Sequence, residues 1–387
     1  MKKIIASTLL LAISGTAIAA ESLSTKIDDV DPVPSQRTFK PSITSQIGSS
    51  SNVGRLNKAT SGSFFFISPG LTYEPSISEN TVLNIEVRAE TKTFSTKGAE
   101  TLGNEKNLEL RNTLIWFASD SWETGGDLGG VLGESRIPVQ LDSSTTTAQM
   151  QRFNELNGRV YLAYFAESSS VEIGTEGRRR DYSTPLDDRG NRYEGDYSSL
   201  SGDLQYTKDF SESTKASIKY LYEDKHYGAR PADFSDGAAS AAATPHPKLR
   251  EVANELGLAL AYSFGKISLS TAPSYRVNKD KIFGARDSNT QKIVQKISIP
   301  ISESLSWSPS ITYSTEIFKS FRSAPESDPV NSPLREDSNL KLSGPLKYKL
   351  KTDLELSGDY SYSKKSSNYA NSSYEDQSIS LGLSLTM

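Results

Sequence analysis

The sequence predicts an all-β chain that folds as a transmembrane, antiparallel, up-and-down β-barrel of about 16 strands, within a range of about 14 to 18. Three observations predict this fold: an export leader at the N-terminus, short runs of alternating apolar and polar residues over nearly the whole chain, and a last strand that runs to the final residue. No helical periodicity is sustained for more than a few turns.

The first residues form a secretory leader. Lys2 and Lys3 precede an apolar segment over 4–13, and Ala17-Ile18-Ala19 is a small-x-small cleavage site. We therefore expect a signal peptide over 1–19. The apolar segment is too short to cross a bilayer as a helix, and no later window holds the roughly 18 apolar residues that a spanning helix needs.

Composition excludes several classes of chemistry. The chain of 387 residues has no cysteine and only 35% hydrophobic residues, so disulfides, a thiolate nucleophile and a lipid anchor are excluded. The formal charge of -4 becomes -6 without Lys2 and Lys3, because 41 basic residues then stand against 47 acidic ones. This balance predicts no nucleic-acid partner.

The alternating runs predict membrane-spanning strands. Leu83, Ile85 and Val87 alternate with Asn84, Glu86 and Arg88, and similar runs cover 305–317 and 354–362. In a soluble sandwich the apolar face would meet a second sheet, whereas in an outer-membrane barrel it meets lipid and the polar face meets a wet lumen. Many runs reach about 10 to 14 residues, which is near the length of a tilted spanning strand and favours the barrel.

The connections between runs alternate between short and long, as periplasmic turns and extracellular loops do. We expect tight turns at 119–121, 167–169, 208–213, 265, 302–303 and 351. We expect long loops at 49–62, 95–106, 134–157, 183–194, 228–250, 280–289, 320–337 and 365–373. The Gly-rich segment 122–133 is counted as a strand, and the strand number falls by a pair if it is a loop. Pro273 and Pro309 lie inside runs, where we expect bulges.

The chain therefore divides into a signal peptide (1–19), a flexible periplasmic lead-in (20–36) and a barrel (37–387). In the third long loop, 134–157, the stretch 147–157 has the pattern of a short helix. A loop of this length covers the pore or folds into it. Its charged residues are the candidates for a constriction: Arg136, Asp142, Arg152 and Glu155.

The last strand, 378–387, alternates apolar and polar residues up to Met387. It resembles the C-terminal assembly signal of outer-membrane proteins in Gly382, Leu385 and Met387, although that signal usually ends in Phe. The resemblance implies the barrel-assembly machinery as a partner. A barrel closes by pairing its terminal strand with the first one, because an open edge is not tolerated in hydrocarbon.

A second resemblance involves the opening of the mature chain. Pro41-Ser42-Ile43-Thr44, Ser51-Asn52-Val53 with Arg55, and 64–71 (FFFISPGL) resemble the first two strands of porin-type barrels associated with exopolysaccharide export in Gram-negative bacteria. The resemblance implies the passage of a glycan chain. General porins are relatives in architecture, and their third long loop folds into the pore, the ordinal position that 134–157 occupies here.

The sequence offers little for catalysis or metal binding. Only two histidines exist, His226 and His246. Asp224 lies two residues from His226, so a hydrolase at the outer rim is conceivable, but no nucleophile motif accompanies the pair. We predict no enzyme activity, no cofactor and no metal site.

If the apolar positions face lipid, the charged positions between them face the lumen. The lumen-facing candidates are Glu86, Arg88, Glu90, Glu109, Arg111, Glu172, Glu176, Arg178, Lys215, Lys219, Arg276, Lys341, Lys347, Lys349, Asp353, Glu355 and Asp359. A barrel of about 16 strands leaves an aqueous channel.

The expected function is a passive outer-membrane channel for small solutes or a glycan chain. A plugged or structural barrel, whose charges pair across the lumen, is the alternative. Outer-membrane lipid and lipopolysaccharide are the expected surroundings, and a homo-oligomer is compatible with the sequence.

Overall fold

The structure is a computed structural model that describes residues 38–52, 61–95, 104–140, 146–183, 196–231, 248–281, 286–322, 333–368 and 372–387. The signal peptide, the lead-in, His246 and Asp142 lie outside these ranges, as do the centres of the long connections. In the described ranges, no helix is long and apolar enough to cross a membrane.

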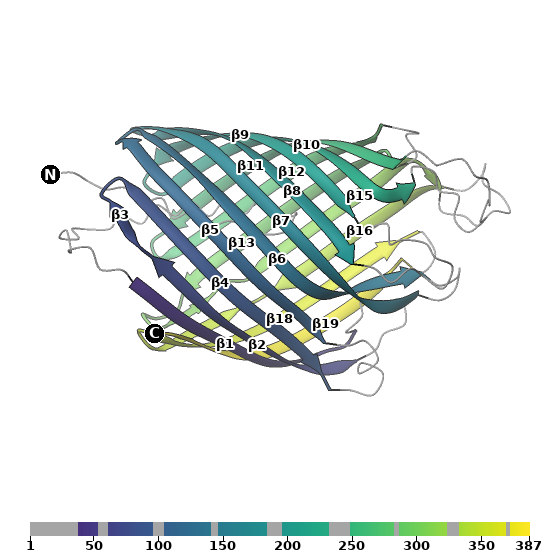
Figure 1. The fold of residues 1–387 in the computed structure, drawn as a ribbon, viewed down its shortest axis with the longest axis horizontal. Helices are drawn as coiled ribbons and strands as arrows, with labels where there is room; N and C mark the ends of the chain where they lie inside the picture. Colours follow the sequence, from purple (N-terminus) through teal and green to yellow (C-terminus); the bar gives the residue numbers. More distant parts are fainter. Residues whose placement is uncertain are drawn as a thin grey trace.

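The described chain consists of strands and the segments that join them (Figure 1). The strands are β1 (Thr38–Ser50), β2 (Gly62–Glu74), β3 (Ser76–Ser78), β4 (Thr81–Phe94), β5 (Glu105–Ser119), β6 (Trp122–Gln140), β7 (Thr146–Ala166), β8 (Ser169–Ser183), β9 (Tyr197–Ser211), β10 (Thr214–Pro231), β11 (Lys248–Phe264), β12 (Ile267–Asp280), β13 (Ser288–Pro300), β14 (Leu305–Trp307), β15 (Ser310–Arg322), β16 (Leu334–Ser343), β17 (Leu346–Lys351), β18 (Leu354–Ser367) and β19 (Tyr374–Thr386).

These 19 segments form one sheet, and they build a closed barrel of 16 wall strands. Three wall strands are each broken once at a proline, which cannot donate to a ladder. Pro75 separates β2 from β3, Pro309 separates β14 from β15, and Pro345 separates β16 from β17. The predicted fold class, an antiparallel up-and-down barrel of about 16 strands, is confirmed.

The wall closes where the last strand pairs with the first. β19 pairs antiparallel with β1 from Ser42↔Thr386 to Ser50↔Ser378, and its other edge pairs with β18. Both ends of the barrel chain therefore lie at one end of the wall, the end with the tight turns (Figure 1). We take that end as periplasmic and the opposite end, with the long connections, as extracellular.

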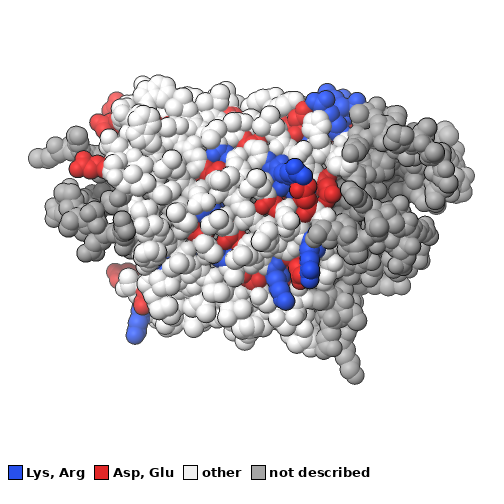
Figure 2. Space-filling model, in the orientation of Figure 1, with Lys and Arg blue, Asp and Glu red and all other residues white. Residues whose placement is uncertain are grey.

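The pleat divides the wall into two faces. In β9 and its partners β8 and β10, exposed apolar side chains share one register: Ile173 lies opposite Leu204, which lies opposite Tyr220. The same face carries exposed apolar side chains around the barrel, including Ile47 on β1 and Leu381 on β19. Such a continuous belt is what a wall facing lipid requires. Figure 2 shows a side of the barrel on which charged side chains are sparse over much of the surface and gather toward the extracellular end.

The Gly-rich segment 122–133 is a wall strand, β6, and its inward glycines make room for side chains of β7. A Cβ atom at Gly125 would lie 2.5 Å from the Tyr161 hydroxyl, and one at Gly133 would lie 2.5 Å from the Phe153 ring. The ring atoms therefore lie against the β6 backbone. A side chain there would displace them, because heavy atoms do not approach so closely.

The expected third loop with a helix over 147–157 is wrong. β6 extends to Gln140 and β7 begins at Thr146, and the two strands pair without interruption from Trp122↔Tyr164 to Gln140↔Thr146. β5 stops pairing at Glu134 and β8 stops at Arg152, so 135–140 and 146–151 continue as a two-stranded ribbon. Pairing with β6 overrides the local helical preference of this stretch.

Two further expectations need correction. Pro273 causes no bulge, because β12 keeps one register with β13 on both sides of it, and Pro309 interrupts a strand without shifting its register. The register shifts lie elsewhere, for example between Lys349 and Lys351. The tight turn at Glu79–Asn80, between β3 and β4, was not predicted from the sequence.

Candidate functional site: the charged inner wall

The predicted lumen residues share the register opposite the apolar belt, with one exception. The residues on this inner face are Glu86, Arg88, Glu90, Glu109, Arg111, Glu172, Glu176, Arg178, Lys215, Lys219, Arg276, Lys341, Lys347, Lys349, Glu355 and Asp359. Asp353 instead lies in the turn between β17 and β18. A turn residue is not subject to the inside–outside alternation on which the prediction rested.

One network of charges crosses four strands, β7 to β10. Arg159 donates through Nη2 to Glu172 Oε1 at 2.6 Å and to Asp203 Oδ2 at 3.1 Å. The ammonium of Lys219 lies 3.2 Å from the same Asp203 oxygen. Two cations thus hold two carboxylates, and the charges of this part of the wall are balanced where they meet.

A second network lies nearer the extracellular end. Glu155 accepts from Arg180 Nε at 2.6 Å, and Arg178 lies between Glu155, at 3.7 Å, and Glu176, at 3.1 Å. The Glu155 side chain is only 4% exposed. Its burial requires ionic partners, since an unpaired carboxylate would lose its hydration without compensation.

The residues expected to form a constriction are therefore not brought together. Glu155 lies on the inner face of β7, whereas Arg152 lies on the outer face, where its Nε is 2.6 Å from Glu134 Oε1. Arg136 is in β6, in the two-stranded ribbon. The helical spacing that joined Arg152 and Glu155 does not exist in a strand, where positions three apart face opposite sides.

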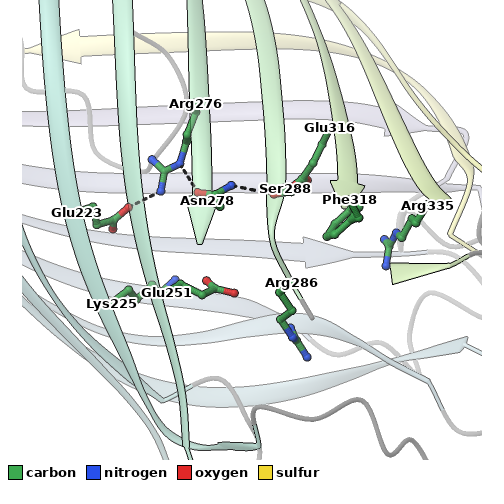
Figure 3. Close-up of a pocket in the computed structure, with 10 residues that line it drawn as sticks. All are labelled: Glu223, Lys225, Glu251, Arg276, Asn278, Arg286, Ser288, Glu316, Phe318 and Arg335. Atoms are coloured by element: carbon green, nitrogen blue, oxygen red, sulfur yellow. Dashed lines mark hydrogen bonds and ion pairs between the residues drawn. The ribbon is translucent and has the colours of Figure 1, made fainter. Parts of the chain in front are cut away.

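β10 to β16 enclose a recess of about 360 Å³ on the inner wall (Figure 3). Its cationic lining comprises Lys225, Arg276, Arg286 and Arg335, and its acidic lining comprises Glu223, Glu251 and Glu316, with Asn278, Ser288 and Phe318.

Arg276 organises one side of the recess. It donates to Glu223 Oε2 at 2.6 Å and to Asn278 Oδ1 at 2.9 Å (Figure 3). Asn278 donates to Ser288 Oγ at 3.1 Å, and Ser288 donates to Glu316 Oε1 at 2.7 Å. On the other side, the Arg335 guanidinium lies 5.0 Å from the Phe318 ring centroid. The recess thus offers an arginine on an aromatic face beside a fixed polar chain.

Sequence reasoning missed several inner-wall residues that make these contacts. Arg180 lies two residues from the predicted lumen residue Arg178, and Arg159 and Asp203 each lie next to an outward apolar residue. The two-residue period of a strand could therefore have predicted that all three face the lumen. Their partners could not be found in this way. Arg159 and Asp203 are 44 residues apart, and only the register of β7 to β9 brings them together.

The His226 and Asp224 pair lies on the outer face of β10. His226 Nε2 is 3.1 Å from Asp224 Oδ1, and Arg250 donates to both Asp224 oxygens at 3.0 and 2.6 Å. Ser198 lies opposite His226 in the ladder, but no hydrogen bond joins the two side chains in the described structure. Among the described residues no group of three or more His, Cys, Asp or Glu could hold a metal ion.

No family model matches the chain, and no curated protein sequence matches it. The chain is similar to several solved structures. An anion-selective porin from Comamonas acidovorans is 13% identical with a TM-score of 0.45, covering 91% of this chain and 100% of the porin. The outer-membrane channel DcaP of Acinetobacter baumannii is 11% identical with a TM-score of 0.49, covering 91% and 97%. A bacterial polysaccharide outer membrane secretin is 11% identical with a TM-score of 0.44, covering 89% and 98%.

The closed wall, its apolar belt and its charged inner face have the architecture of an outer-membrane β-barrel that resembles porins in fold. A wall of this kind cannot lie in water with its belt uncovered, so the belt requires a membrane around it.

Proposed function

We propose that the protein is a passive channel whose charged lumen conducts water-soluble solutes across the outer membrane. The observation that carries this proposal is the closed wall of 16 strands with ionic side chains on its inner face. An 8-stranded barrel fills its interior with side chains, whereas 16 strands leave an aqueous passage. The inner charges need water around them, since buried ions without solvent or partners are costly.

A thiol-blocking experiment tests whether ions pass along the inner face. The chain has no cysteine, so single-cysteine variants react at one place only. Ser314 lies on the inner face of β15, and the neighbouring Tyr313 lies on the outer face and is 46% exposed. Ser314→Cys and Tyr313→Cys therefore form a matched pair on one strand.

In planar bilayers the purified mature protein should give stable ion conductance. A charged, water-soluble methanethiosulfonate should reduce the conductance of Ser314→Cys, because the added group narrows and charges the lumen, and should leave Tyr313→Cys unchanged. Each preparation should run faster on gels before boiling than after, which confirms a folded barrel. A folded protein that stays silent over many insertions would overturn the proposal.

Glycan export is a second candidate, favoured by the hydroxyl groups on part of the inner face. Hydroxyls bond sugar hydroxyls as donors and acceptors. On β12, β15 and β18, inward positions include Ser270, Ser274, Thr312, Ser314 and Ser363. A deletion strain that keeps its surface polysaccharide unchanged would remove this candidate without affecting the channel proposal.

A further inference from the structure

Two sectors of the inner wall differ in how their cationic side chains are paired with carboxylates. On β4 to β9, the inward arginines meet carboxylates: Arg88 bonds Glu86, and Arg111 Nη2 lies 3.2 Å from Glu109. The networks of Arg159 and Arg178 continue this pattern across β7 to β9. Opposite charges in contact largely cancel their field at the distance of a passing ion. The paired charges of this sector therefore offer little net attraction to either sign of ion, while Glu90, Glu123 and Asp127 on the same strands bond neutral groups of Asn107, Tyr161 and Thr113.

The opposite sector contains lysines without such partners. Counted along the 16 wall strands from β1, β5 is the fourth and β13 the twelfth, so the two lie across the lumen from each other. On the β13 side, Lys292, Lys341 and Lys349 have no carboxylate oxygen within 4.0 Å of their ammonium groups in the described chain. Glu255, the charged neighbour that acts on Lys292, is itself 3.5 Å from Arg276.

Hydroxyl groups flank two of these lysines, whereas Lys349 lies opposite Glu355, the carboxylate that Lys347 contacts. Lys292 lies between Ser274 and Ser314 in the ladders of β12, β13 and β15. Lys341 lies between Thr312 and Ser363. A hydroxyl leaves the charge of a neighbouring ammonium uncompensated, and it donates a hydrogen bond to the oxygen of an anion.

Carboxylates in this sector are fewer than the cations and mostly engaged. Asp337 is held by Arg335 and Lys365, and Glu355 lies 3.1 Å from Lys347. Glu316 and Asp359 accept hydrogen bonds from Ser288 and Ser343, and these hydroxyls leave the two negative charges uncompensated, as they do the charges of the lysines.

The lysines continue a path that starts at the recess. Arg276 and Arg335 line the recess near the extracellular end of β12 and β16 (Figure 3). Lys292 and Lys341 follow further down β13 and β16, and Lys349 lies just before the periplasmic turn of β17. Because Arg276 and Arg335 are paired with Glu223 and Asp337, the row without close carboxylate partners in the described chain consists of the three lysines, which follow one side of the lumen toward the periplasmic end. A low-dielectric wall strengthens the field of such a row in the water beside it.

We propose that this row makes the channel prefer anions, and that solutes with carboxylate or phosphate groups pass along it, with Lys292, Lys341 and Lys349 setting the preference. This inference rests on the proposed channel function. It says which class of solute the lumen favours, whereas the channel proposal says only that water-soluble solutes pass.

The test compares ion preference in planar bilayers under a potassium chloride gradient. The unmodified protein should favour chloride over potassium. The triple variant Lys292→Gln, Lys341→Gln, Lys349→Gln should lower the chloride-to-potassium permeability ratio by at least about twofold, because three uncompensated charges are lost. Citrate, used as a tricarboxylate probe, should reduce the potassium chloride current of the unmodified protein more than that of the triple variant.

Two controls separate charge from structure. Replacing a compensated pair, Glu109→Gln with Arg111→Gln, should leave the permeability ratio unchanged. The variant in which the three lysines are replaced by arginine should have the permeability ratio of the unmodified protein, because it keeps the three positive charges. A conducting, heat-modifiable protein that favours potassium, or whose ratio is the same in the triple glutamine variant, would overturn the inference alone. A silent protein would overturn the channel proposal and this inference with it.

Discussion

At the scale of single residues, a glycine on the inner wall lets an aromatic side chain of the next strand lie flat against the backbone, out of the lumen. Tyr161 donates from its hydroxyl to Glu123 Oε1 at 2.7 Å while its ring lies over Gly125. Both Tyr161 and Glu123 are buried in the wall. A phenol ring standing upright would instead occupy the lumen. The glycine therefore serves both the stability of the wall and the width of the passage.

Gly125→Ala should displace the Tyr161 ring, since the new Cβ would lie 2.5 Å from its hydroxyl and 2.6 Å from Cζ. Loss of the Tyr161 to Glu123 bond should destabilise the barrel by about 1–3 kcal/mol. The measurement is the denaturant midpoint of the folded band on gels, together with single-channel conductance, which should fall. Gly177→Ala is the control, because a Cβ there meets nothing within 4 Å. Equal midpoints for the two variants would show that the ring can move at no cost.

At the scale of elements, alternation predicts strands only where a bilayer imposes it. In the belt, one face must be apolar, so the charged residues of β4 and β5, such as Glu86 and Glu109, could be placed on the inner face from the sequence. Beyond the bilayer both faces meet water, and 134–157 loses its alternation. The spacing of three residues between Arg152 and Glu155 then predicts, wrongly, that both lie on one side of a helix. Ion pairs between strands, such as Arg159 with Asp203, depend on register, which the sequence pattern does not determine.

The two-stranded ribbon formed by the extensions of β6 and β7 should be dispensable for the barrel wall. Residues 135–140 and 146–151 pair with each other and, in the described chain, with no other strand. Replacing 137–149 by a two-residue Asn-Gly turn should therefore leave the wall closed, because such a turn fits a tight hairpin. The variant should keep its gel shift on heating. A second deletion of similar length, 155–166, removes wall pairs with β6 and β8 and should abolish folding. Loss of the gel shift in the first variant would show that the ribbon is needed to assemble the wall.

At the scale of the whole molecule, the two faces of the wall must meet two solvents. Leu204 is outward and 49% exposed, between Ile173 and Tyr220, while the next residue, Gln205, is inward, between Glu172 and Lys219. Both lie near the middle of β9, well away from its periplasmic turn. One step along the chain thus separates hydrocarbon from the aqueous lumen.

This step gives the last prediction. Leu204→Arg should destabilise the protein by about 2–4 kcal/mol, the cost of an arginine near the bilayer midplane on the lipid face of a barrel. Gln205→Arg should change stability by less than about 1 kcal/mol, because water and the neighbouring carboxylates receive the new charge. Reversible denaturant unfolding in lipid vesicles, followed by tryptophan fluorescence, measures both values. Costs that are equal within error would mean that the face carrying Leu204 does not meet lipid, and the assignment of the belt would fail for the entire wall.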